Sequence, residues 1–387
     1  MSQPRMKILL VADQFYSANN GMTISARRFA AVLRAHGHEV RILSYGTPEN
    51  ASDGHPAYLL GKQYIPIFDR LISSHGMTFA KPDEAVIREA VSWAELVHFL
   101  TPFALTHRTI LCCRELGVPF TGAFHVQPEN ITSSIHLGKV GWLNTAIYHW
   151  FHHYVYRYCT HIHCPSRFIA GELRRTGYRE QLHVISNGID PDFRACREEK
   201  TPEFSGKFVI MMTGRLSIEK RQDVLVRAVA QSAHRDEICL VLAGNGPRKE
   251  AIHALARRLG ICMVNRFYTK PDLIHMLAMA DLYVHAADME IEAMSCMEAF
   301  ACGRVVVIAN SPKSATPQFA LDERSLFRAG DSRDLAGKID YWIDHPQQRQ
   351  EMEARYAALA EKYALDACVC QAEEMFRQAI AEAGHDA

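Results

Sequence analysis

The sequence predicts an α/β protein with two doubly wound domains, each built on a parallel sheet. Short apolar runs alternate with stretches of helical periodicity along almost all of the 387 residues, which is typical of parallel α/β architecture. A polar segment at 194–206 interrupts this pattern, which then restarts. A chain of this length also exceeds what one hydrophobic core usually organises. We therefore expect one domain at 1–192 and a second at 193–364.

The first domain is expected to alternate six strands with helices. Apolar runs predict the strands, at 7–12, 39–43, 96–100, 119–124, 161–164 and 182–185. Helical periodicity predicts helices at 21–35, 104–116 and 166–175. Since parallel sheets bind ligands beyond the carboxyl ends of their strands, the loops that follow these strands are the places to look for a site.

The second domain repeats this arrangement. Its predicted strands lie at 208–213, 238–243, 263–267, 282–285 and 305–308. Its predicted helices lie at 221–232, 247–259 and 272–279. From 335 to 383 the sequence is helical nearly to the end, with breaks near Pro346 and Leu365.

Composition excludes several classes of protein. Lys+Arg and Asp+Glu both total 43, so no overall field favours nucleic acid. The eleven cysteines include no CxxC pair and fit free thiols of a reducing compartment better than a disulfide framework. No apolar run approaches the roughly 20 residues that span a bilayer, and no signal peptide is evident. We expect a cytoplasmic protein with at most peripheral membrane contact.

Two cations follow the strand at 208–213. The turn Gly214-Arg-Leu-Ser-Ile-Glu-Lys220 brings Arg215 and Lys220 close to the start of the next helix. Fixed cations beside the positive end of a helix suit a diphosphate. Two surface cations near a loop are an equally good explanation of this spacing. At the next strand–helix junction, Gly244 and Gly246 permit close approach of backbone to a ligand, although such a pair more often only forms a turn.

Glu290 and Glu298 follow the strand at 282–285. A loop glutamate and a glutamate in the first turn of a helix could both accept hydrogen bonds from vicinal hydroxyls. However, Ser295-Cys-Met-Glu298 also fits a capping box, which by itself explains Glu298 better. Glu292, between the two, is expected to be solvated.

The first domain offers two weaker candidates. The strand at 7–12 ends in a polar loop, Asp13–Asn20, in which Asn19 and Asn20 precede Gly21. Gly21 permits close backbone approach, and the missing GxGxxG argues against an NAD enzyme. His125 directly follows the strand at 119–124. Functional side chains often take this place, although a lone histidine is more often structural.

An aromatic segment at 142–158 allows two interpretations. It fits a buried helix, which we favour slightly, or an interfacial helix that seats Trp and Tyr at a membrane surface. His149, His152 and His153 lie within it without a carboxylate or cysteine at ligand spacing. We therefore predict no metal site.

Together these motifs resemble the large glycosyltransferase family 4, whose members are retaining enzymes with the GT-B fold. That fold has two Rossmann-like domains facing a central cleft. The segment from Gly214 to Lys220 matches the family's G-R-x-x-x-E-K motif, and 243–247 matches its A-G-x-G-P turn. Glu290 and Glu298 match its E-x₇-E motif.

The resemblance implies a nucleotide-sugar site in the second domain. Arg215 and Lys220 would hold the donor phosphates, and the Gly244–Gly246 turn would belong to the same site. Glu290 would bind the transferred sugar, and Glu298 the ribose hydroxyls.

In the first, acceptor-side domain, Gly21 would approach the donor phosphate and His125 would contact sugar and acceptor. The final helix, at 365–387, would cross back to this domain. The resemblance implies no cofactor and no metal ion.

The resemblance also implies the reaction. A hexose would pass from a nucleotide diphosphate sugar, expected to be a UDP-sugar, to a hydroxyl acceptor. We expect a membrane lipid such as a diacylglycerol or ceramide-like alcohol at the inner membrane surface. Transfer to a lipid-linked oligosaccharide for capsule or lipopolysaccharide is the alternative acceptor chemistry. A sugar-nucleotide epimerase and a non-catalytic nucleotide-sugar binding protein are alternatives of another class. The segment 291–295 lacks the glycines usual in the family, which leaves the donor sugar open.

Overall fold

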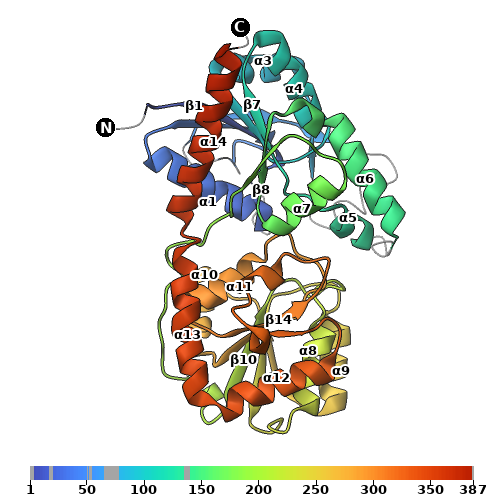
Figure 1. The fold of residues 1–387 in the computed structure, drawn as a ribbon, viewed down its shortest axis with the longest axis vertical. Coiled ribbons are helices and arrows are strands. Elements are labelled where there is room, and N and C mark those ends of the chain that lie inside the picture. The colour runs from blue at the N-terminus through green and yellow to red at the C-terminus, as the bar shows by residue number, and fades with distance from the viewer. Residues whose placement is uncertain are drawn as a thin grey trace. The chain divides into compact units, whose positions relative to one another are not determined.

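The computed structural model describes residues 4–16, 21–49, 51, 55–64, 78–134 and 140–385. The chain forms two compact units (Figure 1). Unit 1 comprises Met1–Gly188 and Leu365–Ala387, and unit 2 comprises Ile189–Ala364. The sequence had suggested a first boundary slightly later, at 192.

Unit 1 contains a seven-stranded parallel sheet in the order β3-β2-β1-β6-β7-β8-β9. Its strands are β1 (Lys7–Gln14), β2 (Glu39–Tyr45), β3 (Ala57–Leu60), β6 (Leu96–Phe99), β7 (Phe120–Ala123), β8 (His161–Cys164) and β9 (Gln181–Val184). The sequence missed β3, an edge strand of four residues. A short antiparallel pair, β4 (Lys62–Gln63) and β5 (Phe79–Ala80), forms a second sheet that lies against β1 and β2.

Helices flank this sheet. They are α1 (Gly21–Ala35), α3 (Glu84–Trp93), α4 (Ala104–Leu116), α5 (Pro128–Ser134), α6 (Gly141–Tyr154), α7 (Arg167–Arg175) and α14 (Leu365–His385). The sequence missed α3, which begins where the Asp83 carboxylate accepts hydrogen bonds from the backbone N–H groups of Ala85 and Val86, an N-cap. α1 and α14 pack side by side (Figure 1) and bury a shared core with β1 and β2.

Unit 2 contains a six-stranded parallel sheet in the order β12-β11-β10-β13-β14-β15. Its strands are β10 (Phe208–Thr213), β11 (Ile238–Ala243), β12 (Cys262–Arg266), β13 (Leu282–His285), β14 (Val306–Asn310) and β15 (Leu326–Arg328). The sequence missed only β15, a three-residue edge strand.

The helices of unit 2 are α8 (Gln222–Gln231), α9 (Lys249–Leu259), α10 (Lys270–Met279), α11 (Met294–Ala301), α12 (Ser332–Asp344) and α13 (Pro346–Glu361). α8 packs against both α9 and α12, and α11 packs against α13. Together the two units confirm the predicted doubly wound α/β fold. Within the part of the chain that is described, no helix combines the length and apolarity needed to cross a membrane.

The two crossings between the units run beside one another. The Ile189 N–H donates to the Tyr363 carbonyl at 2.7 Å. Gly188 has φ +75°, and a Cβ there would lie 2.6 Å from the Leu365 Cα. Only glycine fits this position, both because of its backbone conformation and because of the neighbouring chain.

Candidate functional site

In unit 2 the candidate residues gather where the strand order reverses. β10 pairs with β11 on one side and with β13 on the other. The loop 214–221 leaves the carboxyl end of β10, and the loop 286–293 leaves the carboxyl end of β13. Open α/β sheets bind ligands at such a reversal, because the chain departs in opposite directions and leaves a crevice.

An ion pair joins these two loops. The Lys220 ammonium donates to the Glu290 carboxylate, and His285, the last residue of β13, contacts the same oxygen through Nε2 at 3.0 Å. The side chains of Lys220 and Glu290 are only 19% and 13% exposed, and that of His285 is fully buried. The Asp288 N–H donates to the Glu219 carbonyl at 2.8 Å, so backbone contact reinforces the side-chain contact.

These neighbours determine the charge of Glu290. Burial alone would raise its pKa, but the Lys220 charge and the hydrogen bond with His285 outweigh burial and lower the pKa to about 2. Glu290 is therefore ionised at every working pH and can only accept hydrogen bonds. That suits a ligand hydroxyl and does not suit a general acid.

The same loops contain unusual backbone conformations. Among the described residues other than glycine, only Arg221 and Ala293 have positive φ, at 53° and 67°. Each directly precedes a helix, α8 and α11 respectively, and neither supplies a side-chain cap to it. Strained residues of this kind cluster at ligand sites, and uncapped helix starts leave N–H groups for an anion.

Arg215 lies in the first of these loops and differs from Lys220. Its side chain is exposed, and no hydrogen bond or ion pair to its guanidinium occurs among the described residues; its backbone carbonyl accepts from Gln222. A fixed loop with a free guanidinium is suited to bidentate contact with a phosphate.

Gly244 and Gly246 have a structural explanation. A Cβ on Gly244 would lie 2.2 Å from the Gly214 carbonyl oxygen, and a Cβ on Gly246 would lie 2.4 Å from that of Leu216. The Leu216 N–H also donates to the Asn245 carbonyl at 3.0 Å. The glycines therefore permit close packing of two loop backbones, which fixes the loop that contains Arg215.

The structure corrects two expectations around Glu298. α11 begins at Met294 after Ala293, so Ser295 is already helical and Glu298 lies beyond the first turn. The capping box is therefore wrong, because the left-handed Ala293 starts the helix earlier than the sequence pattern suggests. Glu298 is half-buried, and Glu292, expected to be solvated, is buried instead.

Unit 1 also has a strand reversal, between β1 and β6. Asp13, near the end of β1, accepts hydrogen bonds from the Thr101 hydroxyl at 2.7 Å and the Ala80 N–H at 3.2 Å. Burial raises the pKa of Asp13 to about 6. Gly21 is the first residue of α1 and has no atom near its Cβ position. Asn19 and Asn20 lie outside the described residues.

His125 belongs to a group of three histidines in unit 1. It follows β7, and its ring meets that of His163 edge-on, with 5.2 Å between the ring centroids. The ring centroid of His98 lies 6.0 Å from that of His163. Burial lowers the pKa of His125 to about 3 and that of His163 to about 4. Together with Asn187 they line a small pocket, so a ligand there meets neutral imidazoles.

The aromatic segment 142–158 forms α6 and a following 3₁₀ turn. Tyr148 and Phe151 are buried, whereas Trp142 and Trp150 are 75% and 48% exposed. The segment is therefore not simply a buried helix, because two of its largest apolar side chains face outward. Of its histidines, His152 contacts the Glu180 carboxylate at 2.7 Å.

Sequence reasoning missed several of these residues. In unit 2, His285 contacts Glu290 of the ion pair, and Asp288 bonds to the loop 214–221. In unit 1, Asp13 lies at the strand reversal, and His163 lines the small pocket. All four lie in, or just after, the carboxyl-terminal part of a parallel strand. A survey of every polar residue at those strand ends could have found them.

Two family models match the chain. "Glycosyltransferase Family 4" matches residues 19–193, and "Glycosyl transferases group 1" matches residues 195–358. A GDP-mannose-dependent alpha-mannosyltransferase of Corynebacterium glutamicum is 27% identical over 90% of this chain and 83% of its own length. An alpha-monoglucosyldiacylglycerol synthase of Streptococcus pneumoniae is 24% identical over 79% and 72%.

Solved structures agree on the fold. HepE of Anabaena, crystallised with UDP and glucose, superimposes with a TM-score of 0.73 at 18% identity, over 97% of this chain and all of that one. Sucrose-phosphate synthase of Thermosynechococcus elongatus gives 0.74 at 16% identity, over 98% of this chain and all of that one. The fold is therefore GT-B, and the two family matches together span 19–358. The chain belongs to glycosyltransferase family 4 and is a glycosyltransferase.

Proposed function

We propose that this protein is a retaining hexosyltransferase that moves a hexose from a UDP-sugar to the hydroxyl of a membrane lipid. It would act at the cytoplasmic face of the membrane, on a diacylglycerol or ceramide-like alcohol. The observation that carries the proposal is the Lys220–Glu290 pair, which joins the two loops at the strand reversal of unit 2.

The charges at this reversal support nucleotide-sugar chemistry. The leaving diphosphate gains negative charge during transfer, and preorganised cations stabilise that charge. Arg215 and Lys220 provide the cations, and the uncapped start of α8 adds backbone N–H groups. Glu290 is ionised and can accept hydrogen bonds from sugar hydroxyls.

The proposed mechanism is front-face transfer. The leaving diphosphate oxygen takes the proton of the attacking hydroxyl, so the sugar keeps its anomeric configuration without a covalent enzyme intermediate. The ion pair supports this route, because Glu290 is already engaged by Lys220 and His285. We propose that transfer needs no metal ion, with Arg215 and Lys220 placed beside the diphosphate.

GDP-mannose is the rival donor. It is favoured by one specific observation, the similarity to the GDP-mannose-dependent alpha-mannosyltransferase of Corynebacterium glutamicum. The residues described above bind phosphates and hydroxyls that both donors share. The transfer experiment must therefore include both.

Two observations support a lipid acceptor. Trp142 and Trp150 are exposed on α6, and exposed Trp side chains are typical of surfaces that meet the membrane interface. In addition, the relative from Streptococcus pneumoniae is named for a glucosyldiacylglycerol product.

The transfer experiment combines donors and acceptors. Purified protein is incubated with UDP-glucose, UDP-galactose, UDP-N-acetylglucosamine or GDP-mannose, with vesicles containing diacylglycerol or ceramide, and with EDTA present. Mass spectrometry identifies the glycolipid, and NMR gives its anomeric configuration. We expect an α-linked product. A β-linked product would overturn retention, and conversion of a UDP-sugar without an acceptor would identify an epimerase.

Variants connect the reaction to the site. Lys220→Ala and Glu298→Ala should abolish transfer while circular dichroism stays unchanged. Arg257→Ala, which removes an exposed cation on α9, is the matched control and should transfer normally. Near-normal turnover by Lys220→Ala would contradict the assignment. Donor binding by the parent without any transfer would identify a binding protein.

A separate experiment tests whether Trp142 and Trp150 bind the membrane. Trp142→Ala/Trp150→Ala should lose co-sedimentation with anionic vesicles. Phe267→Ala is the matched control, because Phe267 is 74% exposed in unit 2, and it should sediment like the parent. Failure of the parent to bind vesicles would favour a soluble acceptor and contradict the lipid proposal.

A further inference from the structure

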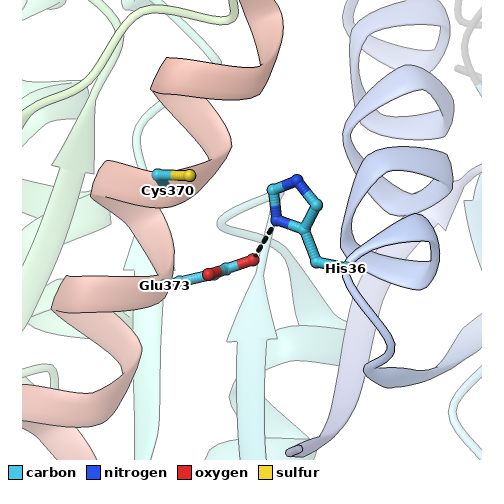
Figure 2. A group of neighbouring side chains, drawn as sticks. All are labelled: His36, Cys370 and Glu373. Atoms are coloured by element: carbon cyan, nitrogen blue, oxygen red, sulfur yellow. Dashed lines mark hydrogen bonds and ion pairs between the residues drawn. The ribbon is translucent and has the colours of Figure 1, made fainter. Parts of the chain in front are cut away.

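Residues from opposite ends of the chain form a cluster in unit 1. His36 directly follows α1, and Cys370 and Glu373 lie on α14. A ring nitrogen, the sulfur and a carboxylate oxygen all lie within 4.8 Å of one another. Figure 2 shows the three side chains in the space between the two helices, with the imidazole facing Glu373. Cys370 and Glu373 share a helix face because they are three residues apart.

The imidazole of His36 is engaged at both nitrogens. Nδ1 lies 2.6 Å from the Glu373 carboxylate, and Nε2 lies 2.8 Å from that of Asp366. The hydrogen bonds to Asp366 and Glu373 raise the pKa of His36. Both ring nitrogens of His36 therefore face carboxylate oxygens.

Further groups orient Glu373. His38 Nε2 lies 3.1 Å from it, and Arg377 donates to its other oxygen at 3.1 Å. His38 Nδ1 accepts from the Met6 N–H at 3.1 Å, so the neutral ring carries its proton on Nε2 and donates to Glu373. The carboxylate is buried and held in one orientation from three sides.

We propose that this cluster is a zinc site, with His36 Nδ1, Cys370 Sγ and a Glu373 oxygen as ligands and water in a fourth position. Zinc takes this mixture of nitrogen, sulfur and oxygen donors in four-coordinate sites. Metal-binding histidines almost always donate their second N–H to a carboxylate, a backbone carbonyl or water, which fixes the ring. Asp366 already occupies that place at Nε2 of His36.

Zinc binds the thiolate of cysteine and an unprotonated nitrogen of histidine, so its binding to Cys370 and His36 would release protons. Burial and the nearby carboxylates, Glu373 first, raise the pKa of Cys370, and the metal charge must outweigh them, as zinc does for coordinating thiols.

Zinc at this site would link the last helix of the chain to the first. α14 is the last helix of the chain and packs on α1 within unit 1. Zinc bound to His36 and Cys370 would fasten α14 to the end of α1. A ligand that binds only the folded state stabilises it by mass action. The site is separate from the loops of unit 2, so zinc is expected to change stability and not the transfer reaction.

Zinc binding to the full chain tests the proposal. Protein stripped with EDTA is dialysed against micromolar ZnCl₂ under reducing conditions, and bound metal is measured by mass spectrometry. The variant is Cys370→Ala, since alanine suits a helix and the cysteine is exposed. The matched control is Cys262→Ala, an exposed cysteine in unit 2. His36→Gln provides a second, independent loss of a ligand.

We expect the parent and Cys262→Ala to bind one zinc per chain at the same affinity. Cys370→Ala and His36→Gln should bind at least about tenfold more weakly, and zinc should raise the melting temperature of the parent but not theirs. Cobalt in place of zinc should give thiolate-to-metal charge-transfer absorption that Cys370→Ala lacks. Unchanged affinity in Cys370→Ala, or no binding by the parent, would overturn the proposal. Transfer rates equal with and without EDTA keep this result distinct from the proposed function.

Discussion

The ion pair between Lys220 and Glu290 makes a strong prediction about stability. We consider Lys220→Met, Glu290→Gln and the double variant. Methionine keeps the length of the lysine side chain without its charge, and glutamine keeps the shape of the glutamate. Each single change leaves the other partner in place, whereas the double change leaves no charge unpaired.

The magnitude follows from the pKa of Glu290. Its ordinary value is 4.5, and its neighbours lower it to about 2. A difference of about 2.5 units corresponds to about 3 kcal/mol of stabilisation at neutral pH. Because the folded pKa is the lower one, this stabilisation is present above about pH 4.5 and is lost as the pH falls through about 2. Lys220→Met removes one of the two groups that lower this pKa and should cost about 3 kcal/mol or more at pH 7, since it leaves a buried carboxylate without its charged partner.

The double variant should recover much of this loss. With Glu290→Gln added, no buried charge is left uncompensated, so the two effects should not add. We expect a coupling free energy of about 2 kcal/mol, which is within the range found for two side chains in contact.

Urea denaturation measures this coupling in unit 2. Of the four tryptophans, only Trp342 lies in unit 2. Replacing the other three by phenylalanine makes the fluorescence of the buried Trp342 a reporter of that unit. Additive single and double variants, with a coupling near zero, would refute the idea that this pair holds the two loops together.

Four further predictions use other parts of the molecule. Arg215→Ala should leave the free energy of unfolding within about 0.5 kcal/mol of the parent but slow transfer about 100-fold or more, measured by initial rates beside urea midpoints. Gly246→Ala should cost about 2 kcal/mol or more because of the Leu216 backbone, whereas Gly337→Ala, with open space around it, should be neutral or slightly stabilising in the same thermal scans. Asp13 has a folded pKa of about 6 against an ordinary 3.8, so the stability of the parent relative to that of Asp13→Asn should fall by about 3 kcal/mol as the pH rises from about 4 to about 6, measured by urea denaturation of both proteins across this range. His125 has a pKa of about 3, so His125→Gln should lower the transfer rate without changing the shape of its pH profile between 5.5 and 8.5. An inflection in the parent's profile that is absent from that of His125→Gln would show that His125 titrates there.

Most of the fold could be predicted because its elements are periodic and buried. β8, β10, β11 and β13 begin and end where the apolar runs do. β3 and β15 could not be found in this way. Each is a short edge strand whose residues are assigned by pairing with a neighbour, and pairing is not visible in local sequence.

The candidate site could also be predicted only in part. Arg215, Lys220 and Glu290 could be proposed because they follow strands at the end where parallel sheets bind ligands, and because they match motifs of the family. The contacts that these residues make could not be predicted from the sequence. The contact of His285 and Lys220 with one oxygen of Glu290 depends on two loops that are distant in sequence. The zinc cluster was missed for the same reason, since His36 and Cys370 come from opposite ends of the chain.

The failure at Glu298 shows how tertiary contacts override a local rule. A capping box assumes that the residue before the helix is extended, but Ala293 is left-handed and α11 starts immediately after it. A non-glycine residue in that conformation costs about 1–3 kcal/mol. At Arg221, the other such residue, contacts that offset the cost are visible: its guanidinium donates to Asp288 at 2.9 Å, and Asp288 is in turn bonded to the loop through Glu219. The network that keeps Arg221 strained therefore also fixes Lys220 beside Glu290. A sequence rule that scores each helix start separately cannot detect this arrangement, because its stability comes from two loops acting on each other.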